Sequence, residues 1–381
     1  MITRRKRTSE SFLASLPEIV DTILRLLPAK TLRTTSCVNR MWFEISRRLL
    51  NERSRCVIKY YDNSFISTKE VDELMDNTWV NPSVVILFNQ RESWHLRRER
   101  DARRTEERHL ARTLNILSRR IPKQCLLLGC TTERVLLDQQ LPIARNRAIL
   151  HKRQGNGLII LPEVDGVQYH HVYLRQPKPA RGQSWAEYFG LDASTPAKLV
   201  ILTALTHSRD FIPHIAAGIR QTYGPRVVVL GAVAHDRIFF NGLLKRTRVT
   251  ALFISGNAFR ACAKFVNNNR DSRFYERIEI LTAEAAEDGY ESFFNMIITS
   301  RFISRGNAFY INSITAFNQP ITEAPTFGLH SYGEFCLSSK DVGKTRPNPC
   351  KRFMKYNTAI FCACSVKKER RPAGGYSITE S

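Results

Sequence analysis

The sequence predicts an α+β fold, in which a small N-terminal helical module precedes a two-lobed region of mixed helices and strands. Apolar residues near the N-terminus recur at helical spacing, whereas most later apolar runs are short and continuous, as in buried strands. The chain has 381 residues, of which 43% are hydrophobic. It is therefore long enough for two or three domains and apolar enough to form a packed core.

The N-terminal module is predicted to contain two amphipathic helices. Ile19 and Leu24 belong to a first apolar stripe, and Pro28 ends that helix because the residue before a proline avoids the α conformation. Trp42 belongs to a second stripe, which steps by three and four residues within 38–49. A segment of about 45 residues buries only part of its surface, so some of these side chains stay exposed unless a partner covers them. The pattern predicts a helix-in-groove contact with another protein.

The module resembles the F-box, a small helical domain that docks on the Skp adaptor of cullin-RING ubiquitin ligases. The likeness rests on two Leu-Pro pairs, an anchoring leucine and a closing Val-x-Arg-x-Trp pattern. Lys30-Thr31 stands where many relatives carry an acidic residue. The resemblance implies adaptor binding through Leu16, Pro17, Ile19, Leu24, Leu27, Pro28, Leu32, Val38 and Trp42. The alternative is a helical hairpin packed into the chain's own core.

Short apolar runs after the module predict the buried strands of a first lobe. These strands cover residues 56–61, 84–88, 125–130, 157–161 and 167–174. Gly166 stands between the last two, so they are expected to form a hairpin. Two prolines and a glycine within 176–183 predict a boundary between the lobes.

The second lobe opens with a predicted strand-helix-strand unit, which implies parallel strands. The unit covers residues 199–202, 210–223 and 227–231. Further strands are predicted at 249–256, 274–281, 308–314 and 357–366, a helix at 285–302, and loop or disorder at 338–352 and from 367 onward. The predicted domains are a basic disordered tail (1–10), the F-box (11–55), the first lobe (56–180), the second lobe (181–366) and a disordered tail (367–381).

Beyond the F-box, the chain resembles F-box proteins that carry a FIST region with N-terminal and C-terminal parts. The residues behind this likeness are Leu27-Pro28-Ala29-Lys30, Pro122-Lys123-Gln124-Cys125, Leu128-Gly129, the unit ending at Gly231, Ser255-Gly256 and Tyr332-Gly333-Glu334. Asn312-Ser313-Ile314-Thr315 stands where such relatives have a Cys-Val-Gly-Arg-Gly run. The resemblance implies that the lobes sense a small ligand or substrate, with Gly333 and Glu334 as candidate contacts. The alternative is a turn glycine beside a solvent-facing glutamate.

A net charge of +23 attracts nucleic acid, anionic membranes and acidic proteins alike. Residues 91–123 carry eleven Lys or Arg against five Asp or Glu, with leucines at helical spacing, which predicts one long amphipathic helix. Its basic face either binds phosphates with a steep salt dependence or is a solvated surface with pairs such as Arg103 with Glu107.

The residues predict no catalytic or metal site. Nine cysteines scattered in apolar runs indicate a reducing compartment, and no signal peptide or membrane span is expected. Cys362 and Cys364 have no nearby His, and His170 and His171 point to opposite faces of a strand. No phosphate loop, nucleophile elbow or metalloprotease motif occurs. The chain is therefore expected to be no enzyme and to use no cofactor.

The sequence thus predicts a substrate-recognition adaptor of a Skp-cullin-F-box ubiquitin ligase. The F-box would hold the Skp adaptor with its cullin and RING subunits, while the FIST lobes capture an unknown protein substrate for ubiquitination. Two alternatives are a nucleic-acid-binding protein that uses residues 91–123 and a small-ligand sensor. Nucleic acid is expected to bind only weakly and non-specifically, and membranes not at all. A cytoplasmic location is expected, and the basic run at 4–7 leaves nuclear entry open.

Overall fold

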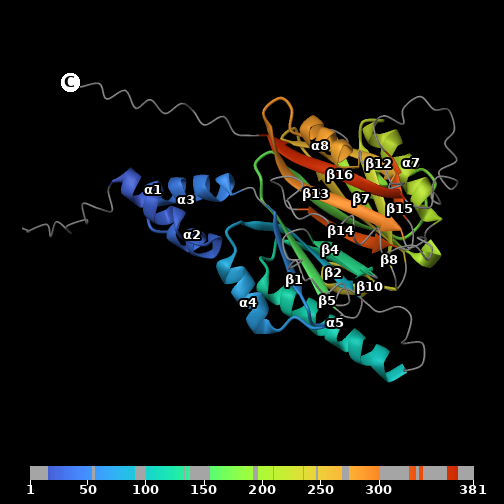
Figure 1. Ribbon diagram of the computed structural model, residues 1–381, viewed down its shortest axis with the longest axis horizontal. Helices are drawn as coiled ribbons and strands as arrows, with labels where there is room; N and C mark the ends of the chain where they lie inside the picture. The colour runs from blue at the N-terminus through green and yellow to red at the C-terminus, as the bar shows by residue number, and fades with distance from the viewer. Residues whose placement is uncertain are drawn as a thin grey trace, which may run out of the picture.

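The computed structural model describes residues 16–53, 56–90, 100–132, 134–137, 155–191, 196–208, 210–234, 236–245, 248–267, 274–300, 326–331, 334–337 and 358–367. Helices α1 to α3 form a small group beside a larger body of sheets and helices (Figure 1). The predicted α+β class, with an N-terminal helical module before mixed sheets, is confirmed. Among the described residues, no helix is long and apolar enough to cross a bilayer.

The N-terminal module contains three helices, which are α1 (Pro17–Arg25), α2 (Ala29–Thr35) and α3 (Arg40–Glu52). The two predicted helices correspond to α1 and α3. Helix α2 was missed because its seven residues carry no apolar stripe: apart from Ala29, only Leu32 is buried. The three helices share one small core, formed by Val20, Leu24, Leu32, Ile45 and Leu49.

Local sequence explains where these helices begin. Pro17 lies in the first turn of α1, where a missing N–H breaks no helical bond. Pro28 directly precedes α2 in an extended conformation. The side chain of Asn39 accepts a hydrogen bond from the backbone N–H of Trp42 at 3.0 Å, which caps α3.

The first sheet is built around a parallel pair. Strands β2 and β3 are parallel and are joined by α5 (Arg100–Arg120), while their other partners are antiparallel. The strands in sheet order are β1 (Val57–Tyr61), β5 (Gly155–Pro162), β2 (Pro82–Gln90), β3 (Leu126–Thr132), β9 (Ile238–Phe240) and β10 (Leu243–Lys245). Helices α4 (Thr68–Asn77) and α5 cover one face of this sheet and bury its apolar side chains.

The second sheet repeats the arrangement. Strands β7 and β8 are parallel, with Leu199 opposite Val228, and α7 (Phe211–Tyr223) joins them, which confirms the predicted strand-helix-strand unit. Helix α6 (Trp185–Phe189) and the 3-10 turn η4 (Thr206–Ser208) complete this region. The strands in sheet order are β15 (Glu334–Leu337), β8 (Val228–Ala234), β7 (Ala197–Leu205), β11 (Val249–Ser255) and β6 (Gln168–Leu174).

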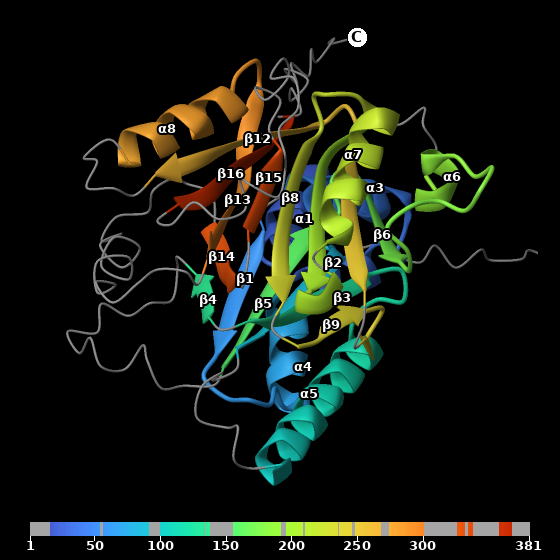
Figure 2. The same ribbon diagram turned by 90° about the vertical axis from the view of Figure 1, so that its right-hand side faces the viewer.

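The third sheet lies against α8 (Phe274–Ala285) and shares a core with the other two. Its strands in sheet order are β12 (Phe259–Asn267), β16 (Thr358–Lys367), β13 (Tyr290–Ser300), β14 (Thr326–Ser331) and β4 (Arg134–Leu137). Ile86 of the first sheet, Leu230 of the second and Phe294 of the third belong to one buried cluster. Figure 2 shows the sheets gathered into one body, with α5 and α8 at different ends.

Strands from each side of the predicted lobe boundary enter the other side's sheet. β6 precedes residues 176–183 yet lies in the second sheet, whereas β9 and β10 follow them and complete the first. The predicted hairpin of 157–161 with 167–174 is wrong, because β5 already has β1 and β2 on its two edges and β6 pairs with β11. Gly166, at a φ of 74°, turns the chain from one sheet to the next. The division into two lobes stays a prediction.

Two elements of the second half were assigned the wrong type. Residues 285–302 were predicted to be helical, but β13 occupies most of this range. A β-bulge between Ser292 and Phe294 breaks the alternation, so Phe293 and Phe294 are both buried and mimic helical spacing. Residues 274–281 were predicted to be a strand, yet they begin α8, which buries Leu281 and Ala285 one turn apart.

Other predicted segments agree or lie outside the described residues. The final strand is present as β16, and the long helix of 91–123 is described from Arg100 to Arg120. The strand predicted at 308–314, the loop at 338–352 and the tails at 1–10 and 368–381 lie outside the described residues, whereas Lys367, predicted to begin the C-terminal tail, ends β16. Strand β12 was missed because Arg260 and Lys264 interrupt its apolar residues.

His171 gives the body a dependence on pH. It is 8% exposed and packs against Phe240, with ring centroids 4.5 Å apart. Burial, together with neighbouring His170, lowers the pKa of His171 from 6.5 to about 3. Between these values the unfolded chain binds a proton that the folded chain excludes, so the free energy of unfolding should fall as the pH drops from 6.5. The expected slope is at most about 1.4 kcal/mol per pH unit.

Urea unfolding at several pH values between 7 and about 4 would measure this slope. His171→Phe should lower this slope by up to the contribution of one proton per chain. Equal slopes for the native chain and His171→Phe would contradict the assignment.

Candidate docking module and its junction with the body

The helical module exposes large apolar side chains that its own core does not cover. Helix α1 directs Val20 and Leu24 inward, yet Ile23 of α1 and Leu26, which directly follows the helix, are 49% and 74% exposed. Val38, before α3, is 60% exposed. Phe43 of α3 is also exposed. Several large apolar side chains that stay exposed on one small module indicate a surface that another protein covers.

The residues predicted to contact the adaptor divide by exposure. Pro17 and Val38 are exposed, and five others are half-buried, namely Leu16, Ile19, Leu27, Pro28 and Trp42. Leu24 and Leu32 are fully buried in the module's core. Direct contact at these two positions does not fit their burial: they stabilise the helices that carry the surface. The remaining assignments stay predictions.

Sequence reasoning left out Ile23, Leu26 and Phe43 as contact residues, although their exposure makes them candidates. Leu26 and Phe43 lie off the apolar stripes that define the module's core. An apolar residue that lies off the core stripe of a short amphipathic helix, or just beyond its end, has no partner inside the module. This pattern was the signal in the sequence that could have identified them as contact residues.

Asp21 holds two of the helices together. Arg25 donates to its carboxylate at 2.8 Å and Arg48 of α3 at 2.6 Å. Burial alone would raise the pKa of Asp21, but the hydrogen bonds and charges of the two arginines outweigh it and lower the pKa. The carboxylate therefore stays ionised at neutral pH and fixes α1 against α3.

Arg53 joins the module to the body. Its guanidinium donates to the carbonyl oxygens of Arg25, the last residue of α1, at 2.9 Å and of Leu27, two residues beyond it, at 2.7 Å. It also donates to the carbonyl of Trp79 at 3.4 Å and lies 4.8 Å from the centre of that indole ring. A cation is favoured at a helix C-terminus, where carbonyl groups lack helical partners. One side chain thus ties α1 to the segment between α4 and β2.

A second set of contacts fixes α2 to the end of α4. The backbone N–H of Ala29 donates to the carbonyl of Thr78 at 2.9 Å. Lys30 lies 2.5 Å from the carboxylate of Asp76. That ion pair is exposed and contributes little by itself, but it adds a further point of attachment. The module is therefore held to the body at two places.

We expect Arg53→Ala to loosen this junction without unfolding the module. Three carbonyls would lose a charged donor, so the junction should lose about 2 kcal/mol. Hydrogen exchange at the Ala29 amide should accelerate, and small-angle scattering should report a larger radius of gyration. Arg47→Ala, at an exposed position of α3, is the control. Unchanged exchange at Ala29 in Arg53→Ala would contradict the role of Arg53.

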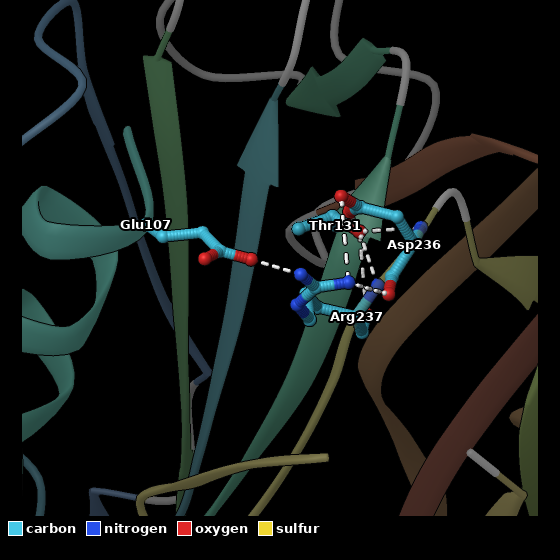
Figure 3. Close-up of polar contacts among 4 residues, drawn as sticks. All are labelled: Glu107, Thr131, Asp236 and Arg237. Carbon is cyan, nitrogen blue, oxygen red and sulfur yellow. Dashed lines mark hydrogen bonds and ion pairs between the residues drawn. The ribbon is translucent and has the colours of Figure 1, made fainter. Parts of the chain in front are cut away.

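Helix α5 is anchored to the body by a polar network at the end of β3 (Figure 3). Glu107 forms an ion pair with Arg237, which also donates to the Asp236 carbonyl at 2.8 Å. Thr131 Oγ1 donates to the Asp236 carboxylate at 2.8 Å and accepts from the Arg237 backbone N–H at 3.0 Å. The predicted pairing of Arg103 with Glu107 stays a prediction, since the Arg103 side chain lies outside the described residues.

The two candidate ligand residues, Gly333 and Glu334, remain predictions. Gly333 lies outside the described residues, and Glu334 begins β15 opposite Ala232 of β8. His170 and His171 have separate surroundings, since His170 lies 3.3 Å from the Phe189 carbonyl and His171 packs on Phe240. Their predicted opposite orientation is consistent with these contacts.

The buried thiols lie in an apolar environment. Cys362 and Cys364 are buried on β16 with their sulfur atoms 3.7 Å apart. Hydrogen bonding to Cys364, then burial, raises the pKa of Cys362. Within the described residues, no group of three or more His, Cys, Asp or Glu is placed to hold a metal ion.

No family model matches the chain. It is similar to F-box only protein 22 of Pongo abelii, with 24% identity over 177 residues, which are 44% of this chain and 43% of that protein. It is 25% identical to F-box only protein 22 of Homo sapiens over 175 residues, with the same coverage. The match thus spans less than half the length of these curated relatives. Together with the N-terminal motif, these similarities support a distant relationship to the F-box proteins.

Proposed function

We propose that this chain is a non-catalytic substrate adaptor of a Skp-cullin-RING ubiquitin ligase. The observation that carries the proposal is the helical module, which combines the F-box pattern with large apolar side chains left exposed on α1, before α3 and on α3. A Skp adaptor would cover these side chains, and the remaining body would be free to bind the protein that is to be ubiquitinated.

The mechanism is proximity. An adaptor that holds a substrate lysine near a charged ubiquitin-conjugating enzyme converts an encounter between free molecules into a local one. The effective concentration depends on how freely the two binding regions move. Arg53 and the contacts of α2 with α4 limit that freedom, so they support a fixed distance between the docking module and the body.

Pro17→Ala is expected to weaken adaptor binding. Pro17 is exposed in the first turn of α1, where it can contact a partner without supporting the module's core. Removal of such an anchor should cost about 2 kcal/mol, or roughly 30-fold in Kd. Calorimetry of the full chain against purified Skp adaptor would measure this change. Trp42→Ala should cost as much, but Trp42 is half-buried against the module's core, so its stability must be measured in parallel.

Pro225→Ala, in the exposed turn after α7, is the matched control. It should bind the Skp adaptor as tightly as the native chain does. If the native chain shows no binding to the adaptor, the proposed function fails.

A further inference from the structure

The exposed side of α5 carries a row of four arginines. Its inner side buries Leu110, Leu114 and Leu117 against the first sheet. Four arginines on the outer side are exposed, namely Arg104, Arg108, Arg112 and Arg119. At 3.6 residues per turn and 1.5 Å per residue, they fall within an arc of about 80° and extend over about 22 Å. These four residues are the arginine row.

The arginine row lacks internal counter-charges, unlike its neighbours. Glu107 pairs with Arg237, and Arg120 pairs with Asp72 at 3.2 Å. Within the part of the chain that the structure describes, no member of the row forms an ion pair. Arg104, Arg108 and Arg112 follow one another at i,i+4 spacing, where like charges repel. The helix is therefore destabilised along this row, and an anionic partner would relieve the repulsion.

The spacing of the row favours an acidic helix over nucleic acid. Carboxylates at i,i+4 spacing on a partner helix repeat about every 6 Å, as Arg104, Arg108 and Arg112 do, and each guanidinium can bind a carboxylate with two hydrogen bonds. The row contains no aromatic side chain on which a base could stack.

We propose that the arginine row docks an acidic helical segment of the protein that this adaptor captures. The proposal rests on the proposed function, because the captured substrate supplies the acidic segment. It assigns the basic helix to substrate recognition and predicts that substrates carry glutamate or aspartate at every fourth residue on one helix face.

A labelled helical peptide tests the proposal with the full chain alone. The probe is an alanine-rich peptide of about 20 residues with glutamates spaced as the arginines are, and its control has the same composition with the glutamates spread around the helix. Fluorescence anisotropy near physiological ionic strength should show about tenfold tighter binding of the first peptide. Arg104→Gln, Arg108→Gln and Arg112→Gln together should abolish this difference.

A second triple variant distinguishes the effect of the arginine row from the effect of a lower net charge. Lys59→Gln, Arg175→Gln and Arg226→Gln remove three exposed positive charges elsewhere and should retain the preference. The proposal would be overturned if the native chain bound the two peptides equally. It would also be overturned if both triple variants lost the preference for the first peptide to the same extent. Tight binding of duplex DNA or RNA that is lost only in the arginine-row variant would also overturn it and assign the row to nucleic acid. Because the assay contains no Skp adaptor, its result is independent of adaptor binding.

Discussion

A chain that carries Leu26→Asp and Val38→Asp is expected to lose Skp-adaptor binding by at least about 100-fold while it keeps its folded stability. Both side chains are mostly exposed, at 74% and 60%, so the free chain tolerates a carboxylate at either position. In a complex, each carboxylate would be buried against apolar surface without a partner, which is strongly unfavourable.

Calorimetry against the adaptor and urea unfolding of the same preparation would measure the two effects separately. Leu243→Asp with Ile280→Asp is a matched control, because these exposed apolar residues lie on β10 and α8, away from the module. The control should bind the adaptor normally. Full affinity in Leu26→Asp with Val38→Asp would exclude this surface as the docking site.

Gly129→Ala is expected to destabilise the body by about 4 kcal/mol. Gly129 lies on β3 between β2 and β9 at a φ of 146°, which side chains rarely adopt. A Cβ atom there would overlap the carbonyl oxygen of Leu87 on the neighbouring strand. Neither strand can move aside, because each is paired on both edges.

Urea unfolding and soluble yield would measure this loss. Gly182→Ala is the control, since its φ is 85° but no atom lies near the added Cβ. Gly182→Ala should lower the free energy of unfolding only by the backbone strain, about 1 kcal/mol. Equal stability of the two variants would show that the close approach of β3 to Leu87 is relieved by a small shift.

Local sequence was sufficient to predict strands that are buried on both faces and strands that are joined by a helix. Strands β2, β3, β5, β7 and β8 are continuous apolar runs, and Gly224 and Pro225 mark the end of α7. Local sequence did not predict which strands pair with one another. The partner of β6 is β11, about 80 residues later, and nothing in the sequence of β6 selects it over β5.

The helical module also contains single residues whose positions the sequence could not predict. Its apolar motif could be predicted, but only the packing of α1 to α3 separates buried Leu24 and Leu32 from exposed Leu26. The role of Arg53 could not be predicted, because its acceptors are backbone carbonyls from two distant segments. Such contacts leave no pattern in the sequence.

The late strands β9 and β10 have a consequence for synthesis of the protein. The first sheet lacks its β3-side edge until Ile238–Lys245 have left the ribosome, although most of its strands are made much earlier. A nascent chain that has reached residue 180 therefore presents β3 with an unpaired edge, a state prone to aggregation. Cotranslational chaperones should associate with this protein over that interval, and ribosome profiling of chaperone-bound nascent chains should show their release once residue 245 has emerged from the exit tunnel, some tens of codons after that residue is translated.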